Sequence, residues 1–328
     1  MTARTAVRSR IWTVNLLTVV VIVVCFAVSL MVGRSGLTVA DIVELLTGDG
    51  SARDRLVFDW RAPRALAAPV FGACLGVSGM IFQSLTRNAL GSPDVIGLNS
   101  GAYTGVIIVL MVGGSGFGEV AVGAVVGSIV AAFAVFVFAY RGGLAGFRLI
   151  IVGIAVSAVL SSFNQWFAVR ADLDESMRAA IWGAGSLNGM TWTPLVAVTC
   201  IALVMACVLG PLSHVMRAFE LGEETAASLG VRVERAKLVM VLVGVVFTAI
   251  VTAVAGPIAF VSLAAPQIAK RLVRSPSLTV TGSALVGAAV LAVGDLTAQH
   301  LLGDVSPPVG AVTVTLGGLY LIWLLLKE

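Results

Sequence analysis

The feature that most constrains this chain is a series of apolar runs, each about 18 to 22 residues long, the length a helix needs to cross a membrane. The runs lack the short alternating pattern of a membrane β-barrel. With 59% hydrophobic residues and 36 glycines in 328 residues, the chain is far more apolar than soluble domains. The sequence therefore predicts an all-α membrane protein, a single domain over residues 1–328 with ten transmembrane helices in one bundle. The ten expected spans cover residues 11–32, 63–84, 95–112, 117–139, 149–169, 193–212, 238–255, 257–273, 279–298 and 307–326.

The basic residues predict how these spans are oriented. Arg4, Arg8 and Arg10 precede the first run, which is too long for a signal peptide and should remain as a span. With the N-terminus inside, fourteen of the 21 Lys and Arg fall on the cytoplasmic side, as the positive-inside rule requires. We therefore expect a multi-pass protein of the cytoplasmic membrane with cytoplasmic N- and C-termini, and an external loop at 33–60 with a short helix starting near Thr38.

A polar segment at 213–237 separates two of the apolar runs, in a chain that is only 12% charged. Glu223 and Glu224 favour a helix N-terminus, the alanines that follow favour helix, and Gly230 suits the position just after a helix. We expect two very short helices joined by a turn, forming a knob that can dock in a groove of a soluble partner. The alternative is an ordinary solvated loop between two spans.

Polar side chains also occur inside the spans. In the span 149–169 they recur at helical spacing, so they either line a water-filled pathway or join helices by hydrogen bonds. Asp295 is the acidic residue placed deepest in a span, and it is either functional or close enough to the external end to reach water. The polar residues of the span 149–169 are Ser157, Ser161, Asn164 and Gln165.

Glycines four residues apart mark several spans. Such seams let helix backbones approach closely in a membrane, so they predict tight helix packing and no chemistry. The seams contain Gly72, Gly76 and Gly79, then Gly97, Gly101 and Gly105, and then Gly123 and Gly127.

No residue pattern indicates catalysis, a metal site or a cofactor. The chain has no phosphate-binding GxxxxGK[ST] loop, no HExxH, and only two histidines, His214 and His300. Its four cysteines lie in apolar runs without metal-binding spacing, and its scattered basic residues form no nucleic-acid patch. Uphill transport by such a chain would need an outside source of energy. Ion coupling usually requires several buried charged residues, whereas ATP coupling needs only a docking surface for an ATPase.

Four stretches together resemble the FecCD-type permeases, the membrane subunits of type II ABC importers for iron-siderophores, haem and cobalamin. The similarity covers essentially the whole chain in unbroken order, and WGAGSLNG at 182–189 is closest to the ferric-enterobactin branch. The stretches are RAPR at 61–64 followed by RNALGSPD at 87–94, GEETAASLGV at 222–231, GPIAFVSL at 256–263, and PVG at 308–310 with LGG at 316–318.

The resemblance implies the type II ABC importer permease fold and a function. The chain would be a permease subunit, not itself an enzyme, that moves a ferric-siderophore across the bacterial cytoplasmic membrane. Its partners would be a second permease subunit, usually a paralogue, two ATPase subunits and an external substrate-binding protein. The alternatives are an ion-coupled secondary transporter and a non-transporting membrane scaffold, and the sequence leaves open which siderophore is carried.

The resemblance also implies roles at the cytoplasmic side. Two loops, Asn88-Ala89-Leu90 and Leu144-Ala145-Gly146-Phe147, match loops that narrow the path, so Asn88, Leu90, Gly146 and Phe147 either form a gate or only pack the loop ends. The residues that match the segment coupling the permease to its ATPase are Gly222, Glu223, Glu224, Thr225, Ala226, Ala227, Ser228, Leu229 and Gly230.

On the external side the resemblance implies a docking site for the binding protein. With Pro63 in the first turn of the second span, Arg61 and Arg64 would lie near one face and accept carboxylates bidentately. Alternatively, both arginines mark a helix end or pair with Asp59. The sequence departs from the family pattern at Ala89, at Gln267, where a histidine is usual, and at Gln299, where an arginine is frequent.

Overall fold

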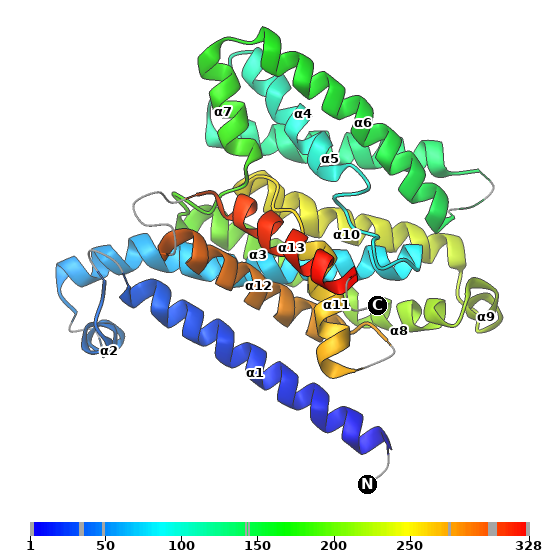
Figure 1. The fold of residues 1–328 in the computed structure, drawn as a ribbon, viewed down its shortest axis with the longest axis horizontal. Helices are drawn as coiled ribbons and strands as arrows, with labels where there is room; N and C mark the ends of the chain where they lie inside the picture. Colours follow the sequence, from blue (N-terminus) through cyan, green and yellow to red (C-terminus); the bar gives the residue numbers. More distant parts are fainter. Residues whose placement is uncertain are drawn as a thin grey trace.

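The computed structural model describes residues 3–32, 36–47, 50–141, 143, 145–274, 277–300 and 307–325, and every element in these ranges is a helix (Figure 1). The helices are α1 (Ala3–Met31), α2 (Val39–Thr47), α3 (Ala52–Thr86), α4 (Leu98–Met111), α5 (Phe117–Ala139), α6 (Gly146–Arg170), α7 (Leu173–Gly183), α8 (Trp192–Glu220), α9 (Glu223–Ser228), α10 (Val233–Ala255), α11 (Val261–Val273), α12 (Val280–His300) and α13 (Val309–Leu325).

Each of the ten expected spans coincides with one of these helices. Seven helices in the described residues, namely α1, α3, α5, α6, α8, α10 and α12, are long and apolar enough to cross a membrane. α4 and α13 are shorter apolar helices, and α11 has 13 residues. The predicted fold class, an all-α membrane protein, is confirmed.

Helix α3 lies at the centre of the bundle. In Figure 1 it runs across the middle with α10 and α12 packed against it, while α4 to α7 form a group along one side and α1 lies along the other. Of the apolar window of α3, 78% is buried inside the protein, against 11% for α6 and 22% for α1. The exposed apolar surfaces of the outer helices are therefore the ones available to lipid.

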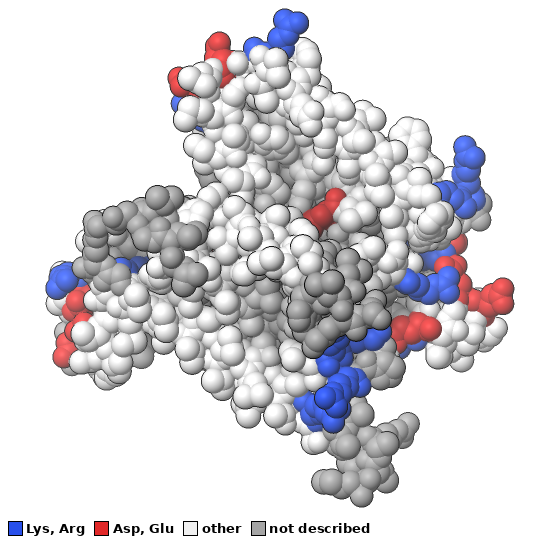
Figure 2. Space-filling view, viewed as in Figure 1, with Lys and Arg blue, Asp and Glu red and all other residues white. Residues whose placement is uncertain are grey.

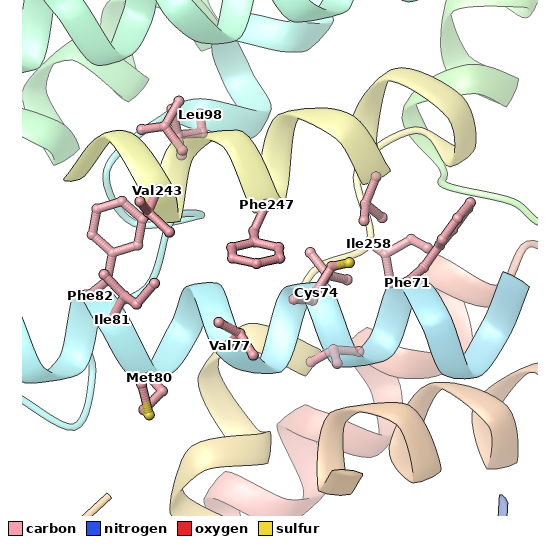
Figure 3. Packing of buried hydrophobic residues seen from close by; sticks show 14 of the residues in the cluster. Phe71, Cys74, Val77, Met80, Ile81, Phe82, Leu98, Val243, Phe247 and Ile258 are labelled. Atoms are coloured by element: carbon pink, nitrogen blue, oxygen red, sulfur yellow. The ribbon is translucent and has the colours of Figure 1, made fainter. Parts of the chain in front are cut away.

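The core between α3 and α10 is built from large apolar side chains (Figure 3). Phe82 and Ile81 of α3 lie beside Val243 of α10, and Phe247 of α10 points toward α3. All four are at most 5% exposed. Met80 points away from α10 on the opposite side of α3 and is also buried, so α3 is covered on both sides.

The predicted glycine seams do bring helix backbones together. A Cβ atom on Gly72 of α3 would lie 2.2 Å from the carbonyl oxygen of Gly287 of α12. Likewise, a Cβ atom on Gly105 of α4 would lie 2.0 Å from the carbonyl oxygen of Gly123 of α5. No side chain fits at these positions, so the seams set the distance between α3 and α12 and between α4 and α5.

Two helix starts show how local backbone geometry moves the beginning of a helix away from the sequence prediction. α3 begins at Ala52, because the Ser51 side chain caps it by accepting a hydrogen bond from the backbone N–H of Asp54. Pro63 therefore lies inside the helix, and its predicted place in the first turn is wrong. α11 begins only at Val261, because Gly256 and Phe260 both have positive φ angles and interrupt the chain after α10.

The short helix expected in the segment 33–60 is present as α2. The backbone N–H of Thr38 donates to the Asp41 carboxylate at 2.7 Å, and the backbone N–H of Asp41 donates to the Thr38 hydroxyl at 3.2 Å. The bond from the Thr38 backbone lowers the pKa of Asp41. This reciprocal capping explains why the helix starts next to Thr38, as the sequence predicted.

Charged side chains gather at the periphery of the molecule (Figure 2). Lys, Arg, Asp and Glu lie around the first turns of α3 at one end of the view, around α9 at the other, and at the top near α6 and α7. The surface between these groups is mostly uncharged, with one acidic group showing near its middle. Such an arrangement is typical of a protein that spans a membrane, because charged groups are costly in the hydrocarbon core.

Candidate functional site

The polar segment 213–237 folds around one short helix, α9. Gly222 (φ +107°) separates α9 from the end of α8, and Gly230 (φ +86°) follows its last turn, as predicted. The expectation of two short helices is wrong, because α8 continues to Glu220 and α10 begins at Val233, which leaves room for α9 alone.

α9 is held by one face and exposes the other. Ala226 is completely buried, whereas Ala227, Ser228 and Leu229 are exposed, with Leu229 at 65%. Glu224 and Thr225 are exposed as well. A small rigid knob anchored by Ala226 therefore presents a free outer surface, which fits the docking role predicted for it.

A polar cleft of about 810 Å³ lies beside α9 and joins the expected coupling and gate residues. It is formed by the end of α3, the segment before α6, the first turn of α9 and the start of α10. The topology predicted from the sequence put these segments on one side of the membrane, and the structure places them together. Among its lining residues are Thr86, Arg87, Arg141, Gly143, Gly146, Phe147, Arg148, Glu223, Glu224, Thr225, Glu234 and Lys237.

One of the expected gate loops packs against the end of α3, directly before the other loop. A Cβ atom on Gly146 would lie 2.7 Å from the Cα of Thr86, so the start of α6 touches the end of α3. Just beyond α3, the Asn88 side chain accepts a hydrogen bond from the backbone N–H of Leu90 at 2.9 Å. Leu90 and Phe147 are 58% and 75% exposed. Leu144 lies outside the described residues.

Ion pairs connect α9 to its surroundings. The Nζ of Lys237 lies 2.7 Å from Oε2 of Glu223 and 3.6 Å from Oε1 of Glu234, and the Lys237 side chain is only 4% exposed. Oε1 of Glu223 lies 3.6 Å from an Nη of Arg87. Sequence reasoning assigned no role to Lys237, although a lysine at the edge of an apolar run was a visible signal.

The four polar residues of α6 that the sequence assigned to a pathway have different surroundings in the structure. Ser161, Asn164 and Gln165 line an open cleft of about 490 Å³. Asn164 is buried and accepts a hydrogen bond from the Thr104 hydroxyl of α4 at 2.8 Å, so it also joins two helices. Ser157 does not line this cleft, and its hydroxyl has no hydrogen-bond partner among the described residues.

A polar cluster that the sequence did not reveal fixes the start of α11. The Asp94 carboxylate accepts hydrogen bonds from the Ser262 hydroxyl at 3.0 Å, from the Asn99 amide at 2.5 Å and from the backbone of Phe260. The Thr252 hydroxyl of α10 in turn donates to Asn99 at 3.3 Å. Asp94 thereby caps a helix start that lies far from it in sequence.

At the other end of the bundle, Arg61 and Arg64 are both engaged within the chain. The Nε of Arg64 lies 3.2 Å from both carboxylate oxygens of Asp295, and its Nη2 lies 2.8 Å from Oδ1. Arg61 donates to carbonyl oxygens at the end of α1, the shortest bond being 2.6 Å to Val32. Arg61 therefore does mark a helix end, although the helix is α1.

Two sequence-based alternatives at this end are wrong. Neither arginine pairs with Asp59, whose carboxylate accepts a hydrogen bond from the indole N–H of Trp192 at 3.3 Å. Asp295 does not reach water, because it is 2% exposed and bound to Arg64. Gln299 also donates to Asp295, at 2.6 Å, so the residue that replaces an arginine acts here as a neutral donor.

Helices of membrane-crossing length, with a short exposed helix and a polar cleft at one end, suit a membrane transport protein, and comparison with known families defines the class. Residues 21–327 match the model of the FecCD transport family, and the chain belongs to this family.

Individual relatives agree with this assignment. The chain is 46% identical over 299 residues to the ferric enterobactin transport system permease protein FepG of Escherichia coli, covering 90% of this chain and 91% of FepG. It is 32% identical to FepD, a permease protein of the ferric enterobactin transport system in the same organism, covering 94% and 93% of the two chains. A solved inward-facing structure of a metal-chelate type ABC transporter superposes with a TM-score of 0.85 at 25% identity, covering 96% of this chain and 99% of that one.

Proposed function

We propose that this chain is a permease subunit of an ATP-driven importer for a ferric siderophore of the enterobactin type. The observation that carries the proposal is the 46% identity to FepG across nine-tenths of both chains. An ABC-transporter fold with a TM-score of 0.85 supports the importer architecture. The clefts beside α6 and α9 give the chain a polar surface that a packed scaffold would not need.

The proposed complex contains a second permease subunit that is a paralogue. FepG and FepD are both permease proteins of the ferric enterobactin transport system in one organism, and this chain is more similar to FepG. The chain therefore takes the FepG-like position beside a FepD-like partner. ATP hydrolysis takes place in a separate pair of ATPase subunits, and an external binding protein delivers the cargo.

The site residues take the following places in this proposal. The chain acts as one permease domain over residues 1–328 with cytoplasmic termini. Residues 222–230 couple it to the ATPase through the exposed face of α9. Asn88, Leu90, Gly146 and Phe147 close the cytoplasmic end, and Ser161, Asn164 and Gln165 line the path. Arg61 and Arg64 mark the external end where the binding protein docks.

Uptake measurements test the function directly. The chain is expressed with its partner permease, ATPase and binding protein in cells without other siderophore importers, and uptake of ferric enterobactin loaded with radioactive iron is measured. We expect uptake that stops when the ATPase is inactivated by mutation and continues after an uncoupler dissipates the ion gradient. A ferric hydroxamate serves as the control cargo and should not be taken up.

Each alternative gives a different result in the same assay. An ion-coupled secondary transporter would lose uptake with the uncoupler and keep it without the ATPase. A membrane scaffold would give no flux under any condition. Equal uptake of enterobactin and hydroxamate chelates would show an importer whose cargo is broader than proposed.

A further inference from the structure

The buried ammonium of Lys237 joins α10 to α9 at the cleft beside α9. Its two carboxylate partners are Glu223, in the first turn of α9, and Glu234, one turn earlier on α10. The Lys237 side chain is 4% exposed, whereas Glu223 and Glu234 are 33% and 47% exposed. The charge of the lysine is therefore enclosed, and the carboxylates extend from it toward the surface.

Each of these two carboxylates also lies close to a residue that directly precedes one of the two proposed gate loops. Glu223 also faces Arg87, which ends α3 in a left-handed conformation (φ +51°) and directly precedes Asn88. Glu234 lies against the other loop, since a Cβ atom on Gly143 would be 3.2 Å from its Oε1. Gly143 is three residues before Gly146. From α9, the first loop is therefore reached through Glu223 and Arg87, and the second through Glu223, Lys237 and Glu234.

The burial of Lys237 makes these contacts difficult to break. A charge withdrawn from water keeps its partners, because separating it from a carboxylate leaves it without compensation in a medium of low dielectric. When α9 moves and Glu223 moves with it, Lys237 and the start of α10 must therefore move as well, or Lys237 must pair more closely with Glu234. An ion pair exposed to solvent would instead separate at little cost in free energy, because water solvates both charges.

We propose that Lys237 is the positioning residue through which movement of α9, carried by Glu223, reaches Glu234 and the gate loop that contains Gly146 and Phe147. The other gate loop needs no such relay, because Glu223 faces Arg87 directly. This inference rests on the proposed function, in which α9 receives the ATPase. In this proposal Lys237 acts through the carboxylates of Glu223 and Glu234 and not through contact with nucleotide or cargo. Its loss should therefore uncouple ATP hydrolysis from gate movement without abolishing hydrolysis.

The test follows the gate and the ATPase in the same sample. The complete complex, with the four native cysteines of this chain replaced by alanine and a Phe147→Cys reporter, is reconstituted in lipid nanodiscs. Reaction of the reporter with a charged maleimide is timed without nucleotide and after trapping with ATP and vanadate. In the complex with native Lys237 we expect several-fold different rates in the two states, and in Lys237→Met we expect that difference to disappear while hydrolysis persists.

Three further variants make the result specific. Lys237→Arg, which keeps a cation, should restore much of the difference. Glu223→Gln, which leaves Lys237 with Glu234, should reduce it and covers the case in which Lys237→Met does not assemble. Lys270→Met removes a lysine from the last turn of α11, outside the cleft, and should behave like the unsubstituted chain.

The possible results separate the inference from the function on which it rests. Unchanged gate movement in Lys237→Met would overturn the role of Lys237 and leave the gate intact. If Lys237→Met and Glu223→Gln both lost ATP hydrolysis as well as gate movement, the two residues would only support the fold. This result would also overturn the proposed role of Lys237. A reporter that ignores nucleotide even with native Lys237 would instead refute the proposed gate.

Discussion

Arg64 and Asp295 show most clearly what a single contact does in this protein. They are 231 residues apart in sequence, and the pair joins α3 to α12 through a fork of hydrogen bonds from Nε and Nη2 to the carboxylate. Arg64 also donates to Asn188 at 2.5 Å. A guanidinium that binds a carboxylate bidentately fixes geometry as well as charge, so this pair sets how three segments meet.

Replacing Asp295 should destabilise the protein. In Asp295→Leu the largely buried Arg64 loses its carboxylate, and removing one partner of a buried pair typically costs about 3–5 kcal/mol. We expect a lower midpoint of thermal denaturation in detergent. The double variant Arg64→Leu/Asp295→Leu should recover part of the loss, because it leaves no unpaired charge.

Asp59→Asn is the matched control for this prediction. Asp59 is an exposed acid on α3 at the same end of the bundle, and its loss should change the midpoint little. A double variant no more stable than Asp295→Leu alone would contradict the argument, since the unpaired arginine would then not be the source of the cost.

Gln267 gives a structural reason for one departure from the family pattern. The side-chain amide of Gln267 donates a hydrogen bond to the side-chain oxygen Oε1 of Gln83 at 2.7 Å. The side-chain N–H of Gln83 in turn donates to the backbone carbonyl oxygen of Leu263 at 2.9 Å. A short chain of amides thus ties α11 to α3. The residue that stands where a histidine is usual contributes to packing here through hydrogen bonds.

Such contacts explain which parts of the site the sequence could predict. The position of α9 follows from the acidic residues Glu223 and Glu224 in its first turn and from Gly230 after its last turn, which act locally, so it was predictable. Lys237, Arg64 and Asp94 also bind distant partners, namely Glu223, Asp295 and Ser262, which lie 14, 231 and 168 residues away and depend on how the helices pack. No local pattern carries that information, and these roles became visible only in the folded chain.

At the scale of elements, hydropathy predicted the order of ten apolar helices, of which seven in the described residues are long enough to cross a membrane, and local geometry decided where some of them begin. α3 gains more than two turns before its apolar run because Ser51 and Asp54 form a cap there. α11 loses its first residues because Gly256 and Phe260 leave the helical region. A hydrophobicity scan detects neither effect, since both depend on backbone conformation.

The glycine seam between α3 and α12 should be intolerant of even one methyl group. Gly287→Ala places a Cβ atom 2.2 Å from the carbonyl oxygen of Gly72, and backbone atoms cannot move aside as a side chain can. Overpacking of this kind typically costs about 1–3 kcal/mol. We expect a lower thermal midpoint and a lower yield of folded protein in detergent.

Gly210→Ala in α8 is the control for the seam. A Cβ atom there meets nothing within 4 Å, and alanine is favoured over glycine in a helix by roughly 1 kcal/mol. Its midpoint should stay the same or rise. If both variants had the same stability, close backbone contact would not be what the α3 and α12 seam provides.

For the whole molecule, the decisive property is the separation of two polar ends by an apolar body (Figure 2). One end holds α9 and the cleft lined by Arg87, Phe147 and Lys237. The other end holds Arg61 and the pair of Arg64 with Asp295. In the proposed importer, the ATPase acts at the first end and the binding protein at the second.

The outer face of α9 should reject added volume. Ala227 is exposed while its neighbour Ala226 is buried, so Ala227→Trp leaves the helix anchored but adds an indole to the docking surface. We expect a folded, inserted subunit that fails to bring the ATPase down in a pull-down and supports no uptake. Ala52→Trp, an exposed alanine at the start of α3, should assemble normally. Normal uptake by an assembled Ala227→Trp complex would argue against docking at this face.

At the opposite end, the structure shows that Arg61 and Arg64, which have equivalent roles in the sequence prediction, bind different kinds of partner. The charge of Arg64 is compensated by Asp295 at 2.8 Å, so the pair contributes little to the field that a distant binding protein meets. Arg61 is bound among the described residues only to backbone carbonyls of Ser29, Leu30 and Val32, and it keeps its positive charge.

Docking of the binding protein should therefore depend on Arg61 more than on Arg64. Rim charges act mainly on association rate and on its sensitivity to salt, which screens them. We expect Arg61→Gln to slow association and flatten its salt dependence in stopped-flow measurements. Arg64→Gln should lower thermal stability and leave the salt slope nearly unchanged. An equal flattening by both variants would show that Arg64 leaves Asp295 to receive the binding protein, and unchanged rates and slopes in both would rule out docking at this end of α3.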